Sequence, residues 1–402
     1  RHIDLPLIMP TATILLIMNC GSILSVGFEK AFLLQNNLNA SVSEIISTYV
    51  YKVGLINNDM SYSSAIGLFN TIVNMVMLII VNTISDKLSG NKNMSKENTA
   101  VTKKKIKRCK EDVVFDAACF IILTLVLFVV AYPLYWVIIS SISAPSAVSS
   151  GKVLLHPIGF TLKGYAEVFK NDQVMRGFLN SLIITFCGVM VNLIVTLPTS
   201  YALSRSNFSG KKPITIFYLI TMFFGGGLIP TYLVIQRLQM LNTIWALILP
   251  GCLSVYNMIV ARTFFKSNIS EELYEAAEID GCTQARFFFQ IALPLSKAII
   301  AILVLYYGVG HWNSYFSALV YISDKAKYPL QLVLRNILIT NQTALSQTAT
   351  TAAARAALQE KQQLIDVMKY SLIIISSIPV LVMYPLVQKH FVKGVMIGSM
   401  KG

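Results

Sequence analysis

Charged residues are scarce in this sequence. Asp, Glu, Lys and Arg make up only 13% of the 402 residues, whereas 55% are hydrophobic. A soluble domain usually contains about 25% charged residues. Apolar runs of about 18 or more residues recur, and a helix of that length crosses the ~30 Å hydrocarbon core of a bilayer. The alternating segments of about 10 residues that build a β-barrel are absent. The composition therefore predicts an all-α polytopic membrane protein.

Sequence patterns for catalysis and metal binding are also missing. The six cysteines form no CxxC pair and the four histidines have no ligand spacing, so neither a disulfide framework nor a metal site is expected. The chain lacks a GxxxxGK[ST] phosphate-binding loop, so we expect no ATP chemistry in it. Carboxylates are nearly absent from the apolar runs, which argues against a proton-driven carrier. The sequence predicts neither an enzyme nor a cofactor in this chain.

The basic residues that are present belong mainly to loops. The net charge is +14, which in a soluble protein would indicate nucleic acid. Lys and Arg collect in cytoplasmic loops of membrane proteins, and the basic run lacks interleaved aromatic residues on which bases could stack. We therefore expect no nucleic-acid partner. The Lys-rich segment 85–112 is interpreted as a cytoplasmic linker, or as a segment that also binds anionic lipid headgroups.

Eight apolar runs define the predicted organisation. The segment 1–84 contains two predicted spans, 85–112 is the linker, and 113–402 contains six predicted spans. The eight spans are 5–24, 65–81, 116–140, 178–200, 213–235, 243–264, 291–311 and 370–388. If the basic linker is cytoplasmic, the loops at 201–212 and 265–290 and the C-terminus are cytoplasmic too.

An internal repeat relates the two parts of the chain. Residues 2–34 align with the region 290–322, so that Leu5-Pro6-Leu7 falls on Leu293-Pro294-Leu295 and Phe28 falls on Phe316. The first two spans therefore look like the last two spans of a second, related module. The earlier part of that module is not in this chain.

The loop between the fourth and fifth spans of the 113–402 segment contains a short acidic helix. Ser270 is a plausible N-cap, and Glu271 and Glu272 follow in the first turn, where the helix dipole favours negative charge. Gly281 can end the helix in the left-handed conformation. Leu273, Ala276, Ala277 and Asp280 are expected on one face, with Glu275 and Glu278 offering carboxylates. The pattern fits a docking helix on the cytoplasmic side, or a solvated amphipathic turn.

The spacing in this loop resembles a known motif. Glu275-Ala276-Ala277, Gly281 and Ile291-x-Leu293-Pro294 are similar to the EAA loop, at 270–294, of binding-protein-dependent ABC importer permeases. Residues 113–402 resemble a complete carbohydrate-uptake permease of the maltose-permease-like class, in segments such as "SYALSR" (200–205) and "YPLQLVLR" (328–335). The ending 384–402 resembles the subgroup that serves oligosaccharides and polysaccharide fragments. Residues 1–84 resemble the C-terminal end of the sister permease.

This resemblance implies a type I ABC importer transmembrane fold and a set of partners. They are a cytoplasmic ABC ATPase dimer that carries ATP and Mg, a sister permease, and an extracellular solute-binding lipoprotein. The resemblance places the protein in the bacterial plasma (inner) membrane with its C-terminus in the cytoplasm. It implies ATPase-coupling roles for Glu275, Ala276, Ala277, Asp280, Gly281, Ile291, Leu293 and Pro294. The 1–84 segment lacks the Glu-Ala-Ala part, so that module has no docking helix in this chain.

The substrate path is a separate prediction. Trp312, Asn313 and Tyr315 lie near the outer end of a span, where aromatic faces and amides could contact a sugar. Trp and Tyr also collect at membrane interfaces and in packing, which is the alternative interpretation. Three alternatives stay open at this point: a permease for a non-sugar solute, a membrane scaffold without a transport role, and an inactive fusion or fragment product.

Overall fold

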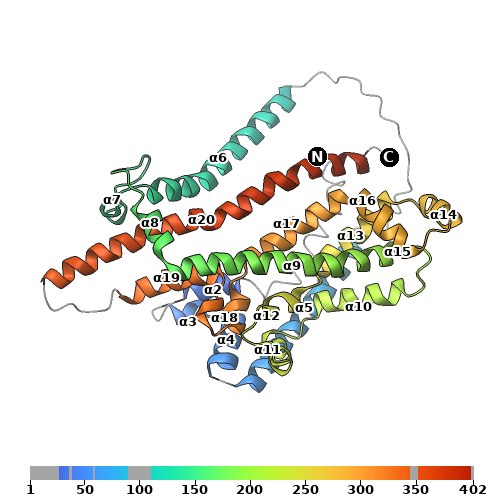
Figure 1. Ribbon diagram of the computed structural model, residues 1–402, viewed down its shortest axis with the longest axis horizontal. Coiled ribbons are helices and arrows are strands. Elements are labelled where there is room, and N and C mark those ends of the chain that lie inside the picture. The colour runs from blue at the N-terminus through green and yellow to red at the C-terminus, as the bar shows by residue number, and fades with distance from the viewer. Residues whose placement is uncertain (1–26, 36–38, 58, 89–109, 345–351, 400–402) are drawn as a thin grey trace. The chain divides into compact units, whose positions relative to one another are not determined.

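The computed structural model describes residues 27–35, 39–57, 59–88, 110–344 and 352–399, and every regular element in these ranges is a helix (Figure 1). The chain divides into two compact units. One contains residues 1–97 and 190–303, and the other contains residues 98–189 and 304–402. The predicted span 5–24 and most of the predicted linker 85–112 lie outside the described residues.

The first unit begins with a small helical cluster and one long helix. A single turn, α3 (Ala40–Ser43), lies between α2 (Phe28–Leu34) and α4 (Ile46–Tyr51), and a π-helical turn at Lys52–Ile56 leads to α5 (Met60–Leu88). Phe28 and Phe32 both pack edge-on against Tyr51, with ring centroids 5.8 and 5.0 Å away. Such pairs contribute about 0.5–1.5 kcal/mol each beyond area burial. The predicted span 65–81 lies within α5.

Two predicted spans of the first unit are broken. The run 213–235 is divided into α10 (Lys211–Phe223) and α11 (Leu228–Arg237), which meet at 113°. Gly227 between them has φ +89°, a conformation that L side chains rarely adopt. The run 243–264 is divided between α12 (Trp245–Ile248), with a 3₁₀ turn at Leu249–Gly251, and α13 (Val255–Asn268), with a 52° bend. Ser254 caps the new helix by accepting a hydrogen bond from the Asn257 amide at 3.4 Å. Each of these two predicted spans is therefore a bent helix pair rather than one straight helix.

The second unit packs around the long C-terminal helix α20 (Ala352–Ser399). Its other helices are α6 (Lys110–Ser141), α7 (Pro145–Ser149), α8 (Lys163–Lys170), α18 (Phe316–Tyr321) and α19 (Leu330–Ala344), with a 3₁₀ turn at Lys325–Lys327. Gly164 on α8 lets the two helices approach closely, because a Cβ there would lie 2.5 Å from the Ser371 hydroxyl. Val168, Leu330 and Leu372 form part of the buried core.

Two helices contribute residues to both units: α9 (Asp172–Ser204) and α17 (Lys297–Asn313). By length and composition, the segments 115–141, 172–204 and 363–385 can each cross a membrane, and three bent helix pairs bring the total in the described residues to as many as six. This agrees with the six spans predicted for 113–402. The last predicted span, 370–388, overlaps the candidate span 363–385 within α20, which continues through Pro379 and Pro385.

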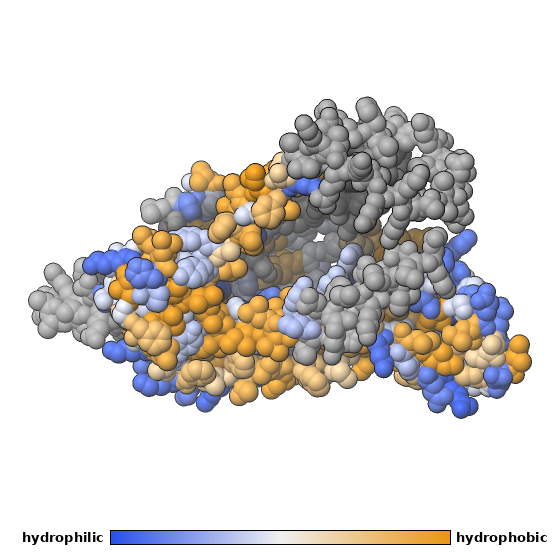
Figure 2. All heavy atoms as spheres, turned by 90° about the horizontal axis from the view of Figure 1, so that it is seen from above, coloured by the Kyte–Doolittle hydropathy of each residue, from blue (hydrophilic) through white to orange (hydrophobic). Residues whose placement is uncertain are grey.

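Apolar side chains make up much of the exposed surface, as Figure 2 shows in orange. On α6, Phe120 and Phe128 are 72% and 70% exposed. A soluble monomer rarely exposes contiguous apolar surface of this extent. The exposed faces of these helices therefore suit lipid as solvent.

Candidate functional site

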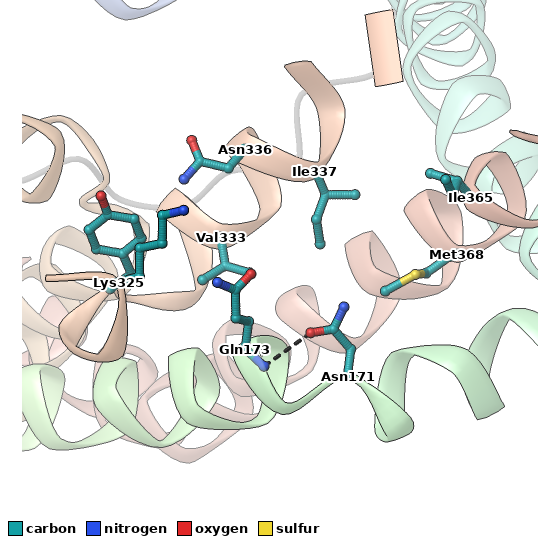
Figure 3. A pocket seen from close by; sticks show the side chains of 9 residues that line it. Asn171, Gln173, Lys325, Val333, Asn336, Ile337, Ile365 and Met368 are labelled. Atoms are coloured by element: carbon teal, nitrogen blue, oxygen red, sulfur yellow. Dashed lines mark hydrogen bonds between the residues drawn. The ribbon is translucent and has the colours of Figure 1, made fainter. Parts of the chain in front are cut away.

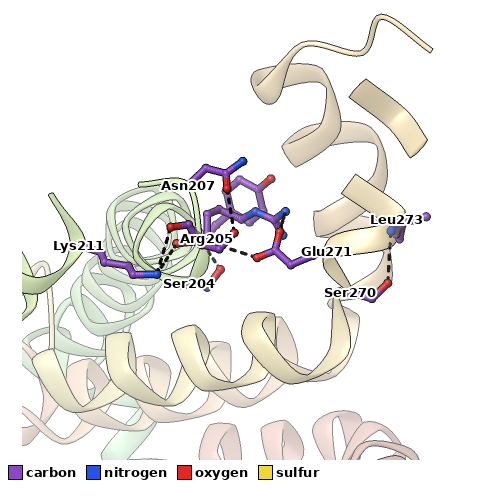
Figure 4. A network of polar contacts seen from close by, with 9 residues as sticks. Ser204, Arg205, Asn207, Lys211, Ser270, Glu271 and Leu273 are labelled. Carbon is purple, nitrogen blue, oxygen red and sulfur yellow. Dashed lines mark hydrogen bonds and ion pairs between the residues drawn. The ribbon is translucent and has the colours of Figure 1, made fainter. Parts of the chain in front are cut away.

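The acidic helix predicted at 270–281 is present as α14 (Glu271–Ile279). Ser270 precedes it and its hydroxyl accepts a hydrogen bond from the Leu273 amide at 3.3 Å (Figure 4). Glu271 and Glu272 occupy the first turn, where their charges complement the helix dipole. The predicted N-cap and first turn are therefore confirmed.

The same helix ends at a glycine, also as predicted. Gly281 has φ +73°, its amide donates to the Glu278 carbonyl at 3.0 Å, and the Cys282 amide donates to the Ala277 carbonyl at 2.9 Å. These two bonds define a Schellman C-cap, which uses the left-handed residue to satisfy terminal carbonyls. Helix α14 is therefore capped at both ends, by Ser270 and by Gly281.

The face by which α14 packs on its own chain is centred on Tyr274 and Ala277. Tyr274 and Ala277 are buried, whereas Ala276 and Asp280 are exposed and Leu273 is 39% exposed. The Tyr274 ring packs edge-on against Phe287, with centroids 5.2 Å apart, and Phe287 is fully buried. Of the four residues expected on one face, Ala277 packs inward beside Tyr274, while Leu273, Ala276 and Asp280 are exposed. Their role in docking stays a prediction.

The outward face of α14 combines charge with one large apolar side chain. Glu275 and Ala276 are exposed, and Ile279 is 87% exposed. These residues stand at i, i+1 and i+4 of one helix, so they lie close together on its surface. A partner could bury Ile279 and approach the backbone at Ala276, while the carboxylate of Glu275 accepts hydrogen bonds.

A buried arginine connects this helix to the end of α9. The Arg205 guanidinium donates from Nη2 to Glu271 Oε2 at 2.6 Å, and the Ser206 amide donates to Glu271 Oε1 at 3.2 Å (Figure 4). The guanidinium also lies 4.3 Å from the centroid of the Tyr274 ring. Arg205 is only 8% exposed. Sequence reasoning included Arg205 only within a recurrent segment, and missed the pairing.

An aromatic cluster lies between the loop and the helices α9 and α13. The Tyr201 ring on α9 lies 5.7 Å from Phe265 on α13 and 5.0 Å from Phe288, centroid to centroid. Beside it, a cavity of about 280 Å³ is lined by residues of the α9 end and of the loop, among them Tyr201, Arg205, Tyr274 and Gln284. The Tyr201 ring therefore joins the end of α9 to α13 and to the second half of the loop.

The second half of the loop turns back into a long helix. Thr283 caps α15 (Gln284–Phe287), a π-helical turn follows at Phe288–Ala292, and a single turn, α16 (Leu293–Leu295), precedes α17. Helix α17 leaves this segment at 80°. Ile291 and Leu293 are half-buried and Pro294 is exposed at this bend. The predicted span 291–311 therefore begins too early, since the continuous helix starts at Lys297.

The predicted substrate-path residues have different environments. Trp312 is 2% exposed, its indole nitrogen donates to the Ser376 carbonyl at 2.8 Å, and its ring packs edge-on against Phe178. For Trp312 these contacts favour the alternative interpretation, packing, and a path role stays a prediction. Asn313 is exposed and Tyr315 is buried, so a path role stays a prediction for these two.

The second unit has a polar cavity of about 410 Å³ (Figure 3). Its polar side chains come from Asn171, Gln173, Lys325, Tyr328 and Asn336, and its apolar wall includes Ile337 and Met368. Asn171 caps α9 by accepting from the Gln173 amide at 3.0 Å. Sequence reasoning did not single out these residues. In the described part of the chain, no group of three or more His, Cys, Asp or Glu side chains could hold a metal ion.

Comparisons with known proteins support one family. No family model matches the chain. The chain is 36% identical over 288 residues to the polygalacturonan/rhamnogalacturonan transport system permease protein YtcP of Bacillus subtilis, covering 72% of this chain and 98% of that protein. It is 44% identical over 86 residues to protein LplB of the same organism, covering 21% of this chain and 27% of that protein.

A solved structure shares the fold. The crystal structure of a bacterial ABC transporter involved in the import of the acidic polysaccharide alginate matches with a TM-score of 0.64 and 27% identity. The match covers 71% of this chain and 100% of that chain.

Proposed function

The chain belongs to the permease subunits of carbohydrate ABC importers, and we propose that α14 is the element by which it docks on the ATPase that drives transport. As a permease it is a transport component rather than an enzyme. ATP and Mg are then bound and used by a separate ATPase dimer. The protein is embedded in the membrane, and the proposed orientation places α14 and the C-terminus in the cytoplasm.

One observation carries this proposal. Helix α14 is capped at both ends and anchored through Tyr274 and Arg205, yet its outward face exposes Glu275, Ala276 and Ile279. An 87% exposed isoleucine on a well-anchored helix gains free energy when a partner covers it, by about 1.5–3 kcal/mol for full burial. A solvated turn, the alternative interpretation, would leave this side chain in water.

In this proposal the residues of the loop have separate roles. Glu275, Ala276 and Ile279 contact the ATPase. Asp280 and Gly281 end the helix, and Ala277 packs inside the loop. Ile291, Leu293 and Pro294 shape the bend through which movement of α14 reaches α17. ATP-driven closure of the ATPase dimer then displaces α14, and Arg205 transmits the displacement to α9.

The test is capture of the ATPase by outward-face variants. The chain is co-expressed with its sister permease and with the ATPase subunit of a carbohydrate ABC importer, and the ATPase that co-purifies in detergent is measured. We expect Glu275→Ala and Ile279→Ser to reduce capture at least tenfold. Ser267→Ala is the matched control, since its hydroxyl bonds only to carbonyls and Asn268 of its own helix end. Equal capture by all variants contradicts the proposal, as does unchanged sugar uptake by a Glu275→Ala/Gly281→Asp double variant.

We further propose that the transported sugar is an oligosaccharide carrying uronic acid units, delivered by an extracellular solute-binding protein. YtcP and the alginate importer are named for acidic polysaccharides. The 410 Å³ cavity contributes Lys325 and three amide side chains, and no carboxylate is among its lining residues. Uptake of galacturonate oligosaccharides, compared with neutral galactose oligosaccharides of equal length, tests this. A preference for the neutral series contradicts it.

Residues 1–84 are proposed to be the C-terminal end of a sister permease joined through 85–112 to a complete permease at 113–402. The 86-residue match with LplB supports this, because its length fits the first segment and the two matches together are shorter than the chain. The sister permease is thus expected as a partner of the complete module. Separate matches of the two segments to two proteins of one transport system would be the decisive observation.

A further inference from the structure

The described part of the segment 1–84, called the first segment below, packs against helix α11 within one unit. Thr71 on α5 donates a hydrogen bond from its hydroxyl to the Gly225 carbonyl at 3.0 Å. Gly225 belongs to the 224–227 segment that separates α10 from α11. A side chain from the first segment therefore contacts the break in the predicted span 213–235.

Two glycines lie at this contact, and the approach is close at Gly54. A Cβ at Gly54 would lie 2.5 Å from Ile229 Cδ1 on α11, and Ile229 is completely buried. At Gly227, a Cβ would lie 3.8 Å from the Gly67 Cα. Small residues allow such backbone approach, and in membranes they mark helix interfaces. The two segments therefore fit as a specific interface.

Hydrogen bonds within the first segment hold α4 and α5 together at this interface. The buried Ser63 hydroxyl donates to the Val50 carbonyl at 2.6 Å and joins α5 to α4. Thr48 is completely buried and its hydroxyl caps α4 at the Ile45 amide. Gly54 is thus presented to Ile229 by a compact hairpin of α4, the π-helical turn and α5.

The interface is incomplete further along α5. A cavity of about 240 Å³ separates α5 from α10 and is lined by apolar side chains, among them Met75, Ile79, Ile220 and Phe223. The lining is open to the surroundings, since Met75 is 46% and Ile220 57% exposed, so α5 and α10 do not pack tightly against each other here. The first segment therefore covers the surface tightly at Gly54 and Thr71 and loosely beyond them.

We propose that α11 and the 224–227 segment form the surface on which the sister permease docks, and that residues 45–88 occupy this surface in cis. This inference rests on the proposed origin of residues 1–84 as a sister-permease end. A tethered segment binds its site at a high effective concentration, on the order of mM for short flexible linkers. The joined segment therefore competes with a separate sister permease for α11.

The first measurement tests occupancy in the full chain. Thr71→Cys and Gly225→Cys are introduced after the native cysteines are replaced by Ser, and a protease site is placed in 89–109. After oxidation and cleavage, a chain joined by the disulfide runs at full length on a non-reducing gel. We expect most of the chain to stay joined. A second pair, Gly67→Cys/Gly225→Cys, probes the same contact. If the two pieces separate with both cysteine pairs, the proposal is overturned.

The second measurement uses LplB as the probe and tests whether it competes with the first segment for α11. Gly54→Leu weakens the cis contact while leaving the α11 surface unchanged, and Gly67→Ala is the matched control because its added methyl meets no atom within 4 Å. In the Gly54→Leu background, co-expressed LplB should lower the disulfide yield at least threefold and co-purify with the chain. The Gly67→Ala background should keep the yield of the unaltered chain.

Failure of this inference is distinguishable from failure of the proposed function. An LplB-independent yield in the Gly54→Leu background overturns the inference. So does equal capture of LplB by the Gly54→Leu and Gly67→Ala chains. ATPase capture is measured in the same samples and depends on α14, so its loss alone contradicts only the docking role of that helix.

Discussion

Arg205 and Glu271 form a 2.6 Å ion pair between the residue that follows α9 and the first turn of α14. The arginine is buried, but the glutamate side chain is 44% exposed, so solvent screens part of the attraction. The stacking of the guanidinium on Tyr274 adds a geometric constraint that a point charge lacks. Arg205 therefore holds the loop in place by stacking on Tyr274 as well as by its ion pair with Glu271.

Arg205→Lys is expected to uncouple transport from ATP hydrolysis. Lysine keeps the positive charge but loses the planar stacking on Tyr274 and the fork geometry toward Glu271. We expect sugar uptake to fall about tenfold while the ATPase still co-purifies. Uptake and ATP hydrolysis measured on the same vesicles check this, and a proportional loss of both would contradict it.

A double-mutant cycle measures the pair itself. Arg205→Ala, Glu271→Gln and the combined variant should show a coupling energy of about 1–2 kcal/mol, below the ~3–5 kcal/mol typical for breaking fully buried pairs, because Glu271 is half-exposed. Thermal unfolding in detergent gives the three stabilities. Additive single-variant effects would show that the two side chains do not interact.

Gly281→Ala is expected to fray the end of α14. The residue has φ +73°, so alanine costs about 1–2 kcal/mol there, although space is available for its methyl. Gly251→Ala is the matched control, since its methyl also meets nothing and its φ is ordinary. Hydrogen exchange of 271–282 should accelerate in the first variant and stay unchanged in the second. Equal exchange in both would contradict a conformational role for Gly281.

The two alanines of the motif are expected to respond differently to the same substitution. Ala277→Leu forces a larger side chain into the buried side of the loop and should cost about 1–3 kcal/mol. Ala276→Leu changes an exposed position and should alter stability by less than about 0.5 kcal/mol. It should still reduce ATPase capture, because it enlarges the docking face. The contrary ranking in thermal stability would contradict the inward orientation of Ala277.

Gly188→Leu is expected to destabilise the contact between α9 and α17. A Cβ at Gly188 would lie 2.5 Å from His311 Nε2, and a ring is less able to move aside than a flexible chain end. Overpacking of this kind costs about 1–3 kcal/mol. Gly310→Ala on the same α17 helix is the control, because its methyl meets nothing within 4 Å. Thermal unfolding of both variants checks the prediction, and equal midpoints would contradict it.

Local features were predictable from the amino-acid sequence. The apolar runs determine where helices can cross a membrane, since length and hydropathy are properties of each run alone. The cap at Ser270 and the left-handed Gly281 were equally predictable, because capping depends on neighbours within a few residues.

Only the tertiary structure decided which faces and pairs matter. Arg205 and Glu271 are 66 positions apart, and their pairing depends on where α9 ends relative to the loop. Tyr274 turns Ala277 inward and leaves Ile279 exposed, an orientation set by packing on Phe287. Trp312 packs on Phe178 and bonds to Ser376, which no local pattern indicates. Hydrophobic periodicity specifies that a helix has an apolar face, but the choice of neighbour is made by shape complementarity across the fold.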